Sequence, residues 1–205
     1  MLIYLIRHGE TKWNLDFKVQ GKKDVPLNEN GISQANILAK YFENKDIDMI
    51  YSSNLMRAKE TANIIAKKLN KNVQIVEDLQ EINFGVWEGY YWEDIKIEYK
   101  DFLKRWENDL ENIPVPEGES YGQVQKRVYK AFNQIISKHD RSSNIIIVSH
   151  GVSIKVLIAK ILDIPIRNLR KFSMDNASIS IVEYNEELKV ISINNTFHLS
   201  KNDDI

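Results

Sequence analysis

Leu2-Ile-Tyr-Leu-Ile-Arg7-His8-Gly9-Glu10-Thr11 stands at the start of the chain, and this stretch decides the fold. Its five leading residues are apolar, and an apolar run of that length predicts a strand buried on both faces. Gly9 predicts a sharp turn directly after the strand. That turn would leave Arg7 and His8 at the carboxyl end of a central strand, where open α/β sheets bind their ligands. Taken alone, however, the pair is more typical of polar residues that close an ordinary core strand.

The composition is that of an ordinary globular protein. The 205 residues are 43% hydrophobic and 28% charged, which predicts one sizeable core in a single domain over 1–205. No apolar run approaches the ~20 residues needed to span a bilayer. The start of the chain lacks the basic region of a signal peptide, so we expect no membrane association and a cytoplasmic protein. The chain has no cysteine, which excludes disulfides, thiolate metal sites and a cysteine nucleophile.

Charge is distributed unevenly along the chain. The formal net charge is −1, but residues 77–119 carry 13 acidic and 4 basic side chains, and the remainder carries 24 basic and 16 acidic ones. The acidic stretch is typical of a solvated helical face. The alternative is a separate cap segment that disfavours highly anionic partners. No basic stripe typical of a nucleic-acid-binding protein is present, so we expect no nucleic-acid partner.

Strand and helix patterns alternate along the chain, which predicts a three-layer α/β sandwich with a mostly parallel central sheet flanked by helices. Ser52 and Ser53 are candidate caps for the second helix. Apolar positions on the first helix predict that Ile32 is buried with its neighbours. Strands are predicted over 2–6, 49–51, 73–76, 144–149, 178–184 and 188–193, and helices over 31–44, 54–70, about 120–138 and about 152–162.

Residues 83–119 interrupt this alternation. They predict two weak helices that end at Pro114-Val-Pro116-Glu-Gly118, and we interpret them as a small helical cap inserted over the sheet edge. Their clustered aromatic residues are more typical of a core than of a ligand platform. Some of these aromatics are still expected at the entrance of a site. The candidates are Trp92, Tyr99, Trp106 and Tyr121.

Polar side chains follow several of the predicted strands. Arg7, His8, Arg57, Glu81 and His150 each fall just after one of them. The carboxyl ends of parallel strands share one edge of a sheet, so we expect these five side chains to meet in one crevice.

Such a set of side chains is suited to phosphoryl transfer. Arginine binds phosphate oxygens through paired N–H donors, and a neutral histidine can attack phosphorus. A carboxylic acid such as Glu81 can protonate the leaving alcohol and later accept a proton from water. Each residue also has an ordinary structural interpretation, so the prediction rests on their meeting. The four histidines share no metal-ligand spacing, and no P-loop motif is present.

Further motifs surround these residues. They are Leu5-Ile6-Arg7-His8-Gly9-Glu10-Thr11-Lys12-Trp13-Asn14, Gln20-Gly21, Pro26-Leu27-Asn28-x-x-Gly31, Ser52-x-x-x-Met56-Arg57-Ala58-x-x-Thr61-Ala62, Glu81-x-x-Phe84-Gly85-x-Trp87-Glu88-Gly89, Gly118-Glu119-Ser120 and Val148-Ser149-His150-Gly151. In this order they resemble the histidine phosphatase superfamily of phosphoglycerate mutase-like proteins. The resemblance covers residues 2 to about 155 and is weaker beyond.

The resemblance implies a role for each matching position. His8 matches the histidine that is transiently phosphorylated, and Glu81 matches the proton donor of many members. The resemblance implies no metal ion and no organic cofactor. We expect a small-molecule phosphate ester as the partner, and a monomer or homodimer. Arg7, Arg57 and His150 match residues that hold the phosphoryl group, and Asn14, Gln20 and Gly21 match further phosphate or substrate contacts.

The length of the cap favours one branch of the family. Only 28 residues separate Gly89 from Gly118, whereas the cofactor-dependent mutases carry a longer insertion. This compact pattern is most similar to the bacterial broad-specificity phosphatases and the α-ribazole phosphatases. We therefore predict a phosphatase that hydrolyses small phosphate monoesters through a phosphohistidine intermediate. The alternatives are a cofactor-dependent phosphoglycerate mutase and a catalytically inactive module that binds phosphorylated ligands.

Overall fold

A six-stranded mixed sheet forms the centre of the molecule. The computed structural model describes residues 1–200. The strands follow the order β3-β2-β4-β1-β5-β6, and the first four run parallel to one another. The last two run antiparallel to their neighbours and form a hairpin with each other. The strands are β1 Leu2–Arg7, β2 Met49–Ser52, β3 Val73–Ile75, β4 Asn144–Ser149, β5 Ile179–Tyr184 and β6 Leu188–Asn195.

Strand β1 lies inside the sheet, as its apolar sequence predicts. It pairs with β4 in parallel, from Leu2 opposite Asn144 to Arg7 opposite Ser149, and with β5 on its other side. Leu5 packs into one hydrophobic cluster and Ile6 into another on the opposite face, and both are buried. Burial on both faces explains why the strand is apolar at successive positions.

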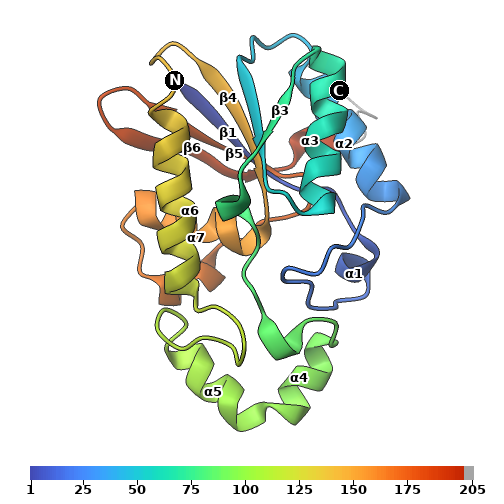
Figure 1. Cartoon of the computed structure of the whole chain (residues 1–205), viewed down its shortest axis with the longest axis vertical. Coiled ribbons are helices and arrows are strands. Elements are labelled where there is room, and N and C mark those ends of the chain that lie inside the picture. The colour runs from blue at the N-terminus through green and yellow to red at the C-terminus, as the bar shows by residue number, and fades with distance from the viewer. Residues whose placement is uncertain (201–205) are drawn as a thin grey trace.

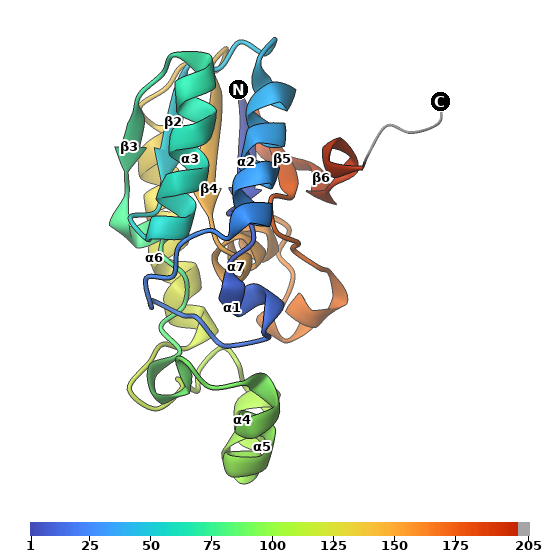
Figure 2. The same cartoon turned by 90° about the vertical axis from the view of Figure 1, so that its right-hand side faces the viewer.

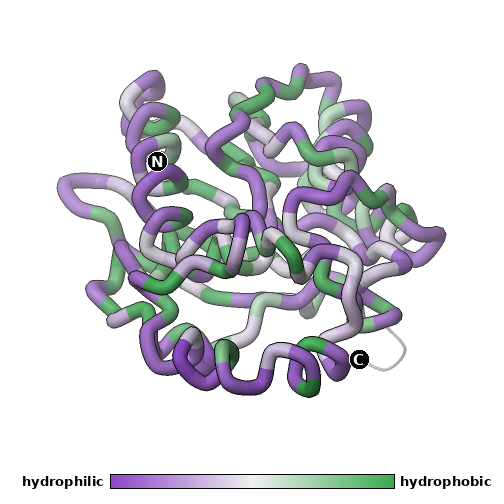
Figure 3. The backbone as a smooth tube through the Cα atoms, turned by 60° about the horizontal axis from the view of Figure 1, so that its bottom comes forward, coloured by the Kyte–Doolittle hydropathy of each residue, from purple (hydrophilic) through white to green (hydrophobic). Residues whose placement is uncertain are grey.

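Helices cover both faces of the sheet, so the predicted three-layer α/β sandwich is confirmed. Helices α2 (Glu29–Phe42) and α3 (Met56–Leu69) lie on one face, and α6 (Tyr121–Ile136) and α7 (Gly151–Ile161) lie on the other (Figures 1 and 2). Hydrophilic and hydrophobic residues alternate along the chain (Figure 3), as expected where one face of each helix packs on a core.

Two predicted details of the helices are wrong. Helix α2 begins at Glu29 because the side chain of Asn28 accepts a hydrogen bond from Gly31 N. On this helix Ile32, which is predicted to be buried, is 46% exposed. Helix α3 has Leu55 at its N-cap without a side-chain hydrogen bond. The hydroxyl of Ser53 lies before this cap, where it accepts from Leu55 N and contacts His150.

The segment 83–119 extends beyond the carboxyl ends of the strands (Figure 1). It contains α4 (Trp92–Glu98) and α5 (Lys100–Asn108). Trp87 is fully buried at the centre of its aromatic cluster, with ring centroids 5.0 Å from Trp106 and 6.0 Å from Tyr99. The prediction that these aromatics form a core is confirmed around Trp87 and Trp106, but not for Tyr90 and Tyr91, which are 38% and 47% exposed. Within residues 1–200, no helix is both long and apolar enough to cross a membrane.

Candidate active site

The five side chains predicted to meet do come together at the carboxyl edge of the sheet. The imidazole rings of His8 and His150 have centroids 5.2 Å apart, and Arg57 Nε donates a hydrogen bond to His8 Nε2 at 3.2 Å. Arg7 and Glu81 flank Gly151, at the start of α7. A methyl group added there would lie 3.5 Å from Arg7 Nε and 3.8 Å from a Glu81 carboxylate oxygen.

The surroundings of His8 define its protonation. The ring is 3% exposed, and its Nδ1 lies 2.7 Å from the carbonyl oxygen of Gly9. A carbonyl can only accept, so Nδ1 carries the proton and Nε2 keeps a lone pair. Burial lowers the pKa of His8 well below its ordinary 6.5, the charges of Arg57 and Arg7 lower it further, and the Gly9 contact opposes them. At neutral pH the imidazole is therefore uncharged, and its Nε2 is unprotonated.

The turn after β1 is tightly packed, which holds His8 in place. The backbones of Gly9 and Gly31 pack so closely that a methyl group added to Gly9 would lie 2.5 Å from the Gly31 carbonyl oxygen. The side-chain amide of Asn176 donates to the carbonyl oxygens of His8 and Gly9 at 3.1 and 3.3 Å, and to Asn14 Oδ1 at 3.2 Å. Asn176 thus connects this turn to Asn14, in the short helix Lys12–Leu15.

A hydrogen bond from Ser53 orients His150. The ring of His150 is fully buried, and its Nε2 lies 2.8 Å from Ser53 Oγ. That hydroxyl can donate its proton to His150 Nε2 while its oxygen accepts from Leu55 N. Nδ1 would then carry the ring proton as a donor. Burial lowers the pKa of His150 well below its ordinary value, and its electrostatic interactions with Arg57, His8 and Arg7 lower it further.

Arg57 is a buried cation that backbone carbonyls hold in place. Its side chain is 1% exposed, and it donates to the carbonyl oxygens of Lys23 at 2.9 Å and Gly21 at 2.8 Å. Burial lowers the pKa of Arg57 to about 10, while Glu81 and Asp24 oppose the shift. Arg57 therefore stays charged at neutral pH. Gly21 contributes its carbonyl group to this site, and at its φ of +52° a side chain would also meet Glu88.

Three buried polar atoms in the site have no partner within residues 1–200. They are Arg7 Nε, His150 Nδ1 and Gln20 Oε1. Folded proteins pair nearly all buried polar groups, so the unpartnered Arg7 Nε–H and His150 Nδ1 indicate where an anionic ligand would supply acceptors, whereas Gln20 Oε1 is itself an acceptor. Arg7 itself is held by a 2.5 Å hydrogen bond to Met174 O, and burial lowers its pKa against the opposing charges of Glu81 and Asp175.

The carboxylate of Glu81 lies at the N-terminus of α7. It accepts hydrogen bonds from the backbone N–H groups of Val152 and Ser153, both at 3.2 Å, and from its neighbour Ile82 at 3.0 Å. The first turn of a helix leaves such N–H groups without intrahelical partners. The helix start therefore positions this carboxylate beside Arg7.

Arg127 fastens the backbone that carries Glu81. Its guanidinium donates to the carbonyl oxygens of Asp78, Gln80 and Glu81 at 2.7–2.9 Å. The same guanidinium also donates hydrogen bonds to both carboxylate oxygens of Glu119. Burial opposes ionisation of Glu119, but its hydrogen bonds with Arg127 lower its pKa overall.

Several of these supporting residues escaped the sequence reasoning. Glu88 and Glu119 stood inside recognisable motifs, so a signal for them existed. Nothing in the sequence singled out Arg127 or Asn176, which reach the site from α6 and from a distant loop. Within the described part of the chain, no three His, Asp or Glu side chains are grouped so that they could hold a metal ion.

A cavity of about 470 Å³ leads from the site to the cap. Its lining includes Arg7 and Glu81 from the site, together with Trp92, Trp106 and Tyr121. The fourth predicted entrance residue, Tyr99, is not part of the lining, because it packs in the aromatic cluster against Trp87.

Comparison with known proteins identifies the family. The family model of the histidine phosphatase superfamily (branch 1) matches residues 3–196. The chain belongs to this superfamily. The predicted family is therefore confirmed, and so is the predicted class of chemistry, phosphoryl transfer from phosphate monoesters.

Individual members of the superfamily match over nearly the whole chain. A probable phosphoglycerate mutase, GpmB, of Yersinia pestis (strain Pestoides F) is 35% identical over 184 residues, which cover 90% of this chain and 85% of that protein. The phosphoserine phosphatase of Entamoeba histolytica superposes with a TM-score of 0.85 at 35% identity, covering 97% of this chain and 99% of that one. The α-ribazole phosphatase of Shigella flexneri gives a TM-score of 0.85 at 30% identity, with coverage of 95% and 96%.

Proposed function

We propose that this histidine phosphatase hydrolyses small-molecule phosphate monoesters in two steps, through a phosphohistidine at His8. The observation that carries the proposal is the unprotonated Nε2 of a neutral, buried imidazole between two arginines. A lone pair is what an attack on phosphorus requires, and the cations can stabilise the charge on the phosphoryl oxygens.

In the first step, His8 Nε2 attacks phosphorus and the bond between phosphorus and the ester oxygen breaks. Glu81, in its protonated form, transfers a proton to that oxygen, so an alcohol leaves and a phosphohistidine remains. Arg7, Arg57 and the Nδ1–H of His150 hold the three remaining phosphoryl oxygens. Phosphate would take over the Arg57 Nε donor that now caps the lone pair of His8.

In the second step, water attacks the phosphorus of the phosphohistidine. The Glu81 carboxylate accepts a proton from that water, the nitrogen–phosphorus bond breaks, and His8 regains its lone pair. Asn14, Gln20 and Gly21 are proposed to complete the phosphate pocket. Gln20 would donate to phosphate through the N–H groups of its side-chain amide, and Gly21 would act through the carbonyl oxygen that holds Arg57.

Small phosphate esters are the proposed partners of this site. The α-ribazole phosphatase and the phosphoserine phosphatase, which was solved with 3-phosphoglyceric acid, support a small substrate. A cytoplasmic location and a monomeric or homodimeric state stay predictions from the sequence.

The similarity to GpmB favours a second candidate function, phosphoglycerate mutase. A mutase must keep water away from its phosphohistidine while a bisphosphate turns over in the site. With only 28 residues between Gly89 and Gly118, the compact cap argues for hydrolysis. Given 3-phosphoglycerate and a trace of 2,3-bisphosphoglycerate, the protein should release inorganic phosphate faster than it forms 2-phosphoglycerate. Faster isomerisation than hydrolysis would make it a mutase.

Replacing the nucleophile should stop the reaction. His8→Ala should lower phosphate release from 4-nitrophenyl phosphate by at least about a thousandfold. Quenched wild-type protein should carry phosphate that is labile to acid and stable to alkali, and the variant should not. His139→Ala is the matched control, because His139 bonds Tyr51 outside the site. Turnover of the His8 variant at the wild-type rate would refute the mechanism, and phosphate binding without turnover by the wild type would indicate an inactive module.

The leaving group should reveal the role of Glu81. Glu81→Gln should slow the hydrolysis of an alkyl ester such as glycerol 3-phosphate by about 10²–10⁴-fold. The loss should be smaller for 4-nitrophenyl phosphate, whose leaving group departs without a proton. Glu77→Gln, an exposed position four residues earlier, serves as the control. Equal losses on both esters would show that Glu81 is not the proton donor.

A further inference from the structure

The side-chain amide of Asn14 is held by its oxygen end alone. Its Oδ1 accepts hydrogen bonds from Thr11 N at 3.1 Å, from the Thr11 hydroxyl at 3.0 Å and from Asn176 Nδ2 at 3.2 Å. An amide oxygen has two lone pairs, so these three donors saturate it. The Nδ2 of Asn14 donates to no group in residues 1–200, and its N–H groups are therefore available to a ligand.

Two fixed donors decide which end of the Asn14 amide faces outward. Half a turn of the side chain would exchange its oxygen and nitrogen, but Thr11 N is a backbone group that can only donate. Asn176 Nδ2 is fixed in turn, because it also donates to the carbonyl oxygens of His8 at 3.1 Å and Gly9 at 3.3 Å. A rotated Asn14 would place its N–H groups against these donors. The contacts thus select one orientation of the amide.

The segment that carries Asn176 is fastened to the end of β1. Ala177 N donates to His8 O at 3.1 Å, and Arg7 N donates to Ser178 O at 3.2 Å. Ala177 is fully buried and has a φ of +56°, in the left-handed region that residues other than glycine rarely adopt. Such strain persists where the surrounding contacts over-determine it, and it is concentrated at functional sites. The strained bend therefore holds Asn176 against the turn that carries His8.

We propose that Asn176 is a positioning residue for phosphoryl transfer, which fixes the amide of Asn14 so that its N–H end faces the phosphoryl group. This inference rests on the proposed phosphatase function. The oxygens of a phosphate group are strong hydrogen-bond acceptors, so only the N–H end of Asn14 can bind them. Because the amide is oriented before the ester arrives, it needs no reorganisation during the reaction. Asn176 acts through Asn14.

A double-mutant cycle tests this dependence. Asn176→Ala should lower kcat/KM on 4-nitrophenyl phosphate by about ten- to a hundredfold, the usual effect of one hydrogen bond to a charged group. Asn14→Ala should lower it at least as much. In the Asn14→Ala protein, adding Asn176→Ala should cost less than about threefold, because no amide is left to orient. Equal factors for Asn176→Ala in both backgrounds would overturn the proposal.

The side-chain signals of Asn14 supply a second readout that needs no turnover. In ¹⁵N-labelled wild-type protein, saturating inorganic phosphate should shift the signals of the Asn14 NH₂ group, because these N–H groups gain a charged acceptor. The shift at saturation should be lost or greatly reduced in Asn176→Ala. An unshifted Asn14 signal in the wild type, or a full shift in the variant, would overturn the proposal. The wild-type measurement stays decisive even if the variant fails to fold.

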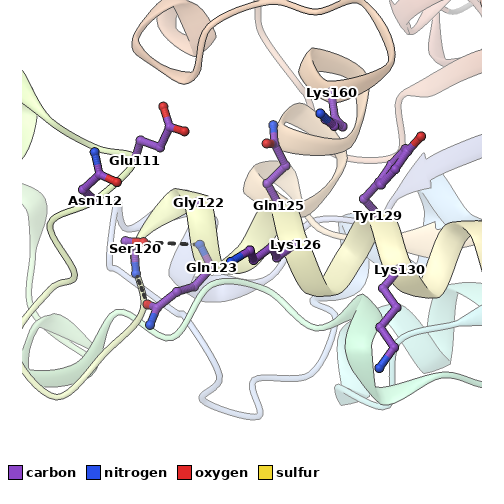
Figure 4. Close-up of a pocket in the computed structure, with 10 residues that line it drawn as sticks. All are labelled: Glu111, Asn112, Ser120, Gly122, Gln123, Gln125, Lys126, Tyr129, Lys130 and Lys160. Carbon is purple, nitrogen blue, oxygen red and sulfur yellow. Dashed lines mark hydrogen bonds between the residues drawn. The ribbon is translucent and has the colours of Figure 1, made fainter.

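Gln125→Ala is the matched control. Gln125 is also a half-buried amide, and its Nε2 donates to the carbonyl oxygen of Val156 at 3.0 Å. It lies in a groove beside α6, near Tyr129 and Lys160 (Figure 4), and this groove contains none of the residues proposed to bind phosphate. The variant therefore loses a comparable hydrogen bond outside the site. Its kcat/KM and the phosphate-induced shift of Asn14 should match those of the wild type.

The two measurements separate this inference from the function on which it rests. A wild type that hydrolyses no ester would contradict the proposed phosphatase function, and the phosphate-induced shift of Asn14 would then decide the role of Asn176 by itself. A wild type that hydrolyses esters, with equal losses for Asn176→Ala in both backgrounds, would leave the phosphatase function intact and overturn the positioning role.

Discussion

The site depends on the burial of one imidazole between two guanidinium groups. Charging His8 would place a third cation beside Arg7 and Arg57 away from water, and burial alone already disfavours that form. The Gly9 carbonyl then selects the tautomer by accepting from Nδ1. These two constraints leave Nε2 with a lone pair at neutral pH. A nucleophile thus results from electrostatics and one backbone contact, without a separate base to activate it.

The surrounding fold keeps those buried cations in place before any ligand arrives. Carbonyl oxygens of Gly21, Lys23 and Met174 bind the two arginines. Such dipoles compensate a buried charge only in part, so a phosphate group would complete what the protein leaves unpaired. The donors in place also need little reorganisation, which is the usual basis of catalysis by preorganised charge. Behind the site, Arg127 and Glu119 connect the Glu81 backbone to α6 and to the base of the cap.

Much of this arrangement could be predicted from the sequence, and the physical reason is strand topology. The apolar runs of β1 and β4 identify two central parallel strands, so the residues after them had to meet. The same argument from strand ends included Arg57 and Glu81. Periodicity could not reveal that Asn28 starts α2 early, or that Ser53 contacts His150 ahead of α3. Contacts such as that of Asn176 with His8 join segments more than 160 residues apart, and no local pattern encodes them.

The central claim concerns the state of His8, and nitrogen NMR of the imidazole groups tests it most directly. In protein labelled with ¹⁵N-histidine, two-bond ¹H–¹⁵N correlations followed from pH 8 to pH 5 report the charge and tautomer of each ring. At pH 7, His8 should be neutral, protonated at Nδ1 and unprotonated at Nε2, with a pKa well below 6.5. An imidazolium at pH 7, or a neutral ring protonated at Nε2, would contradict the account.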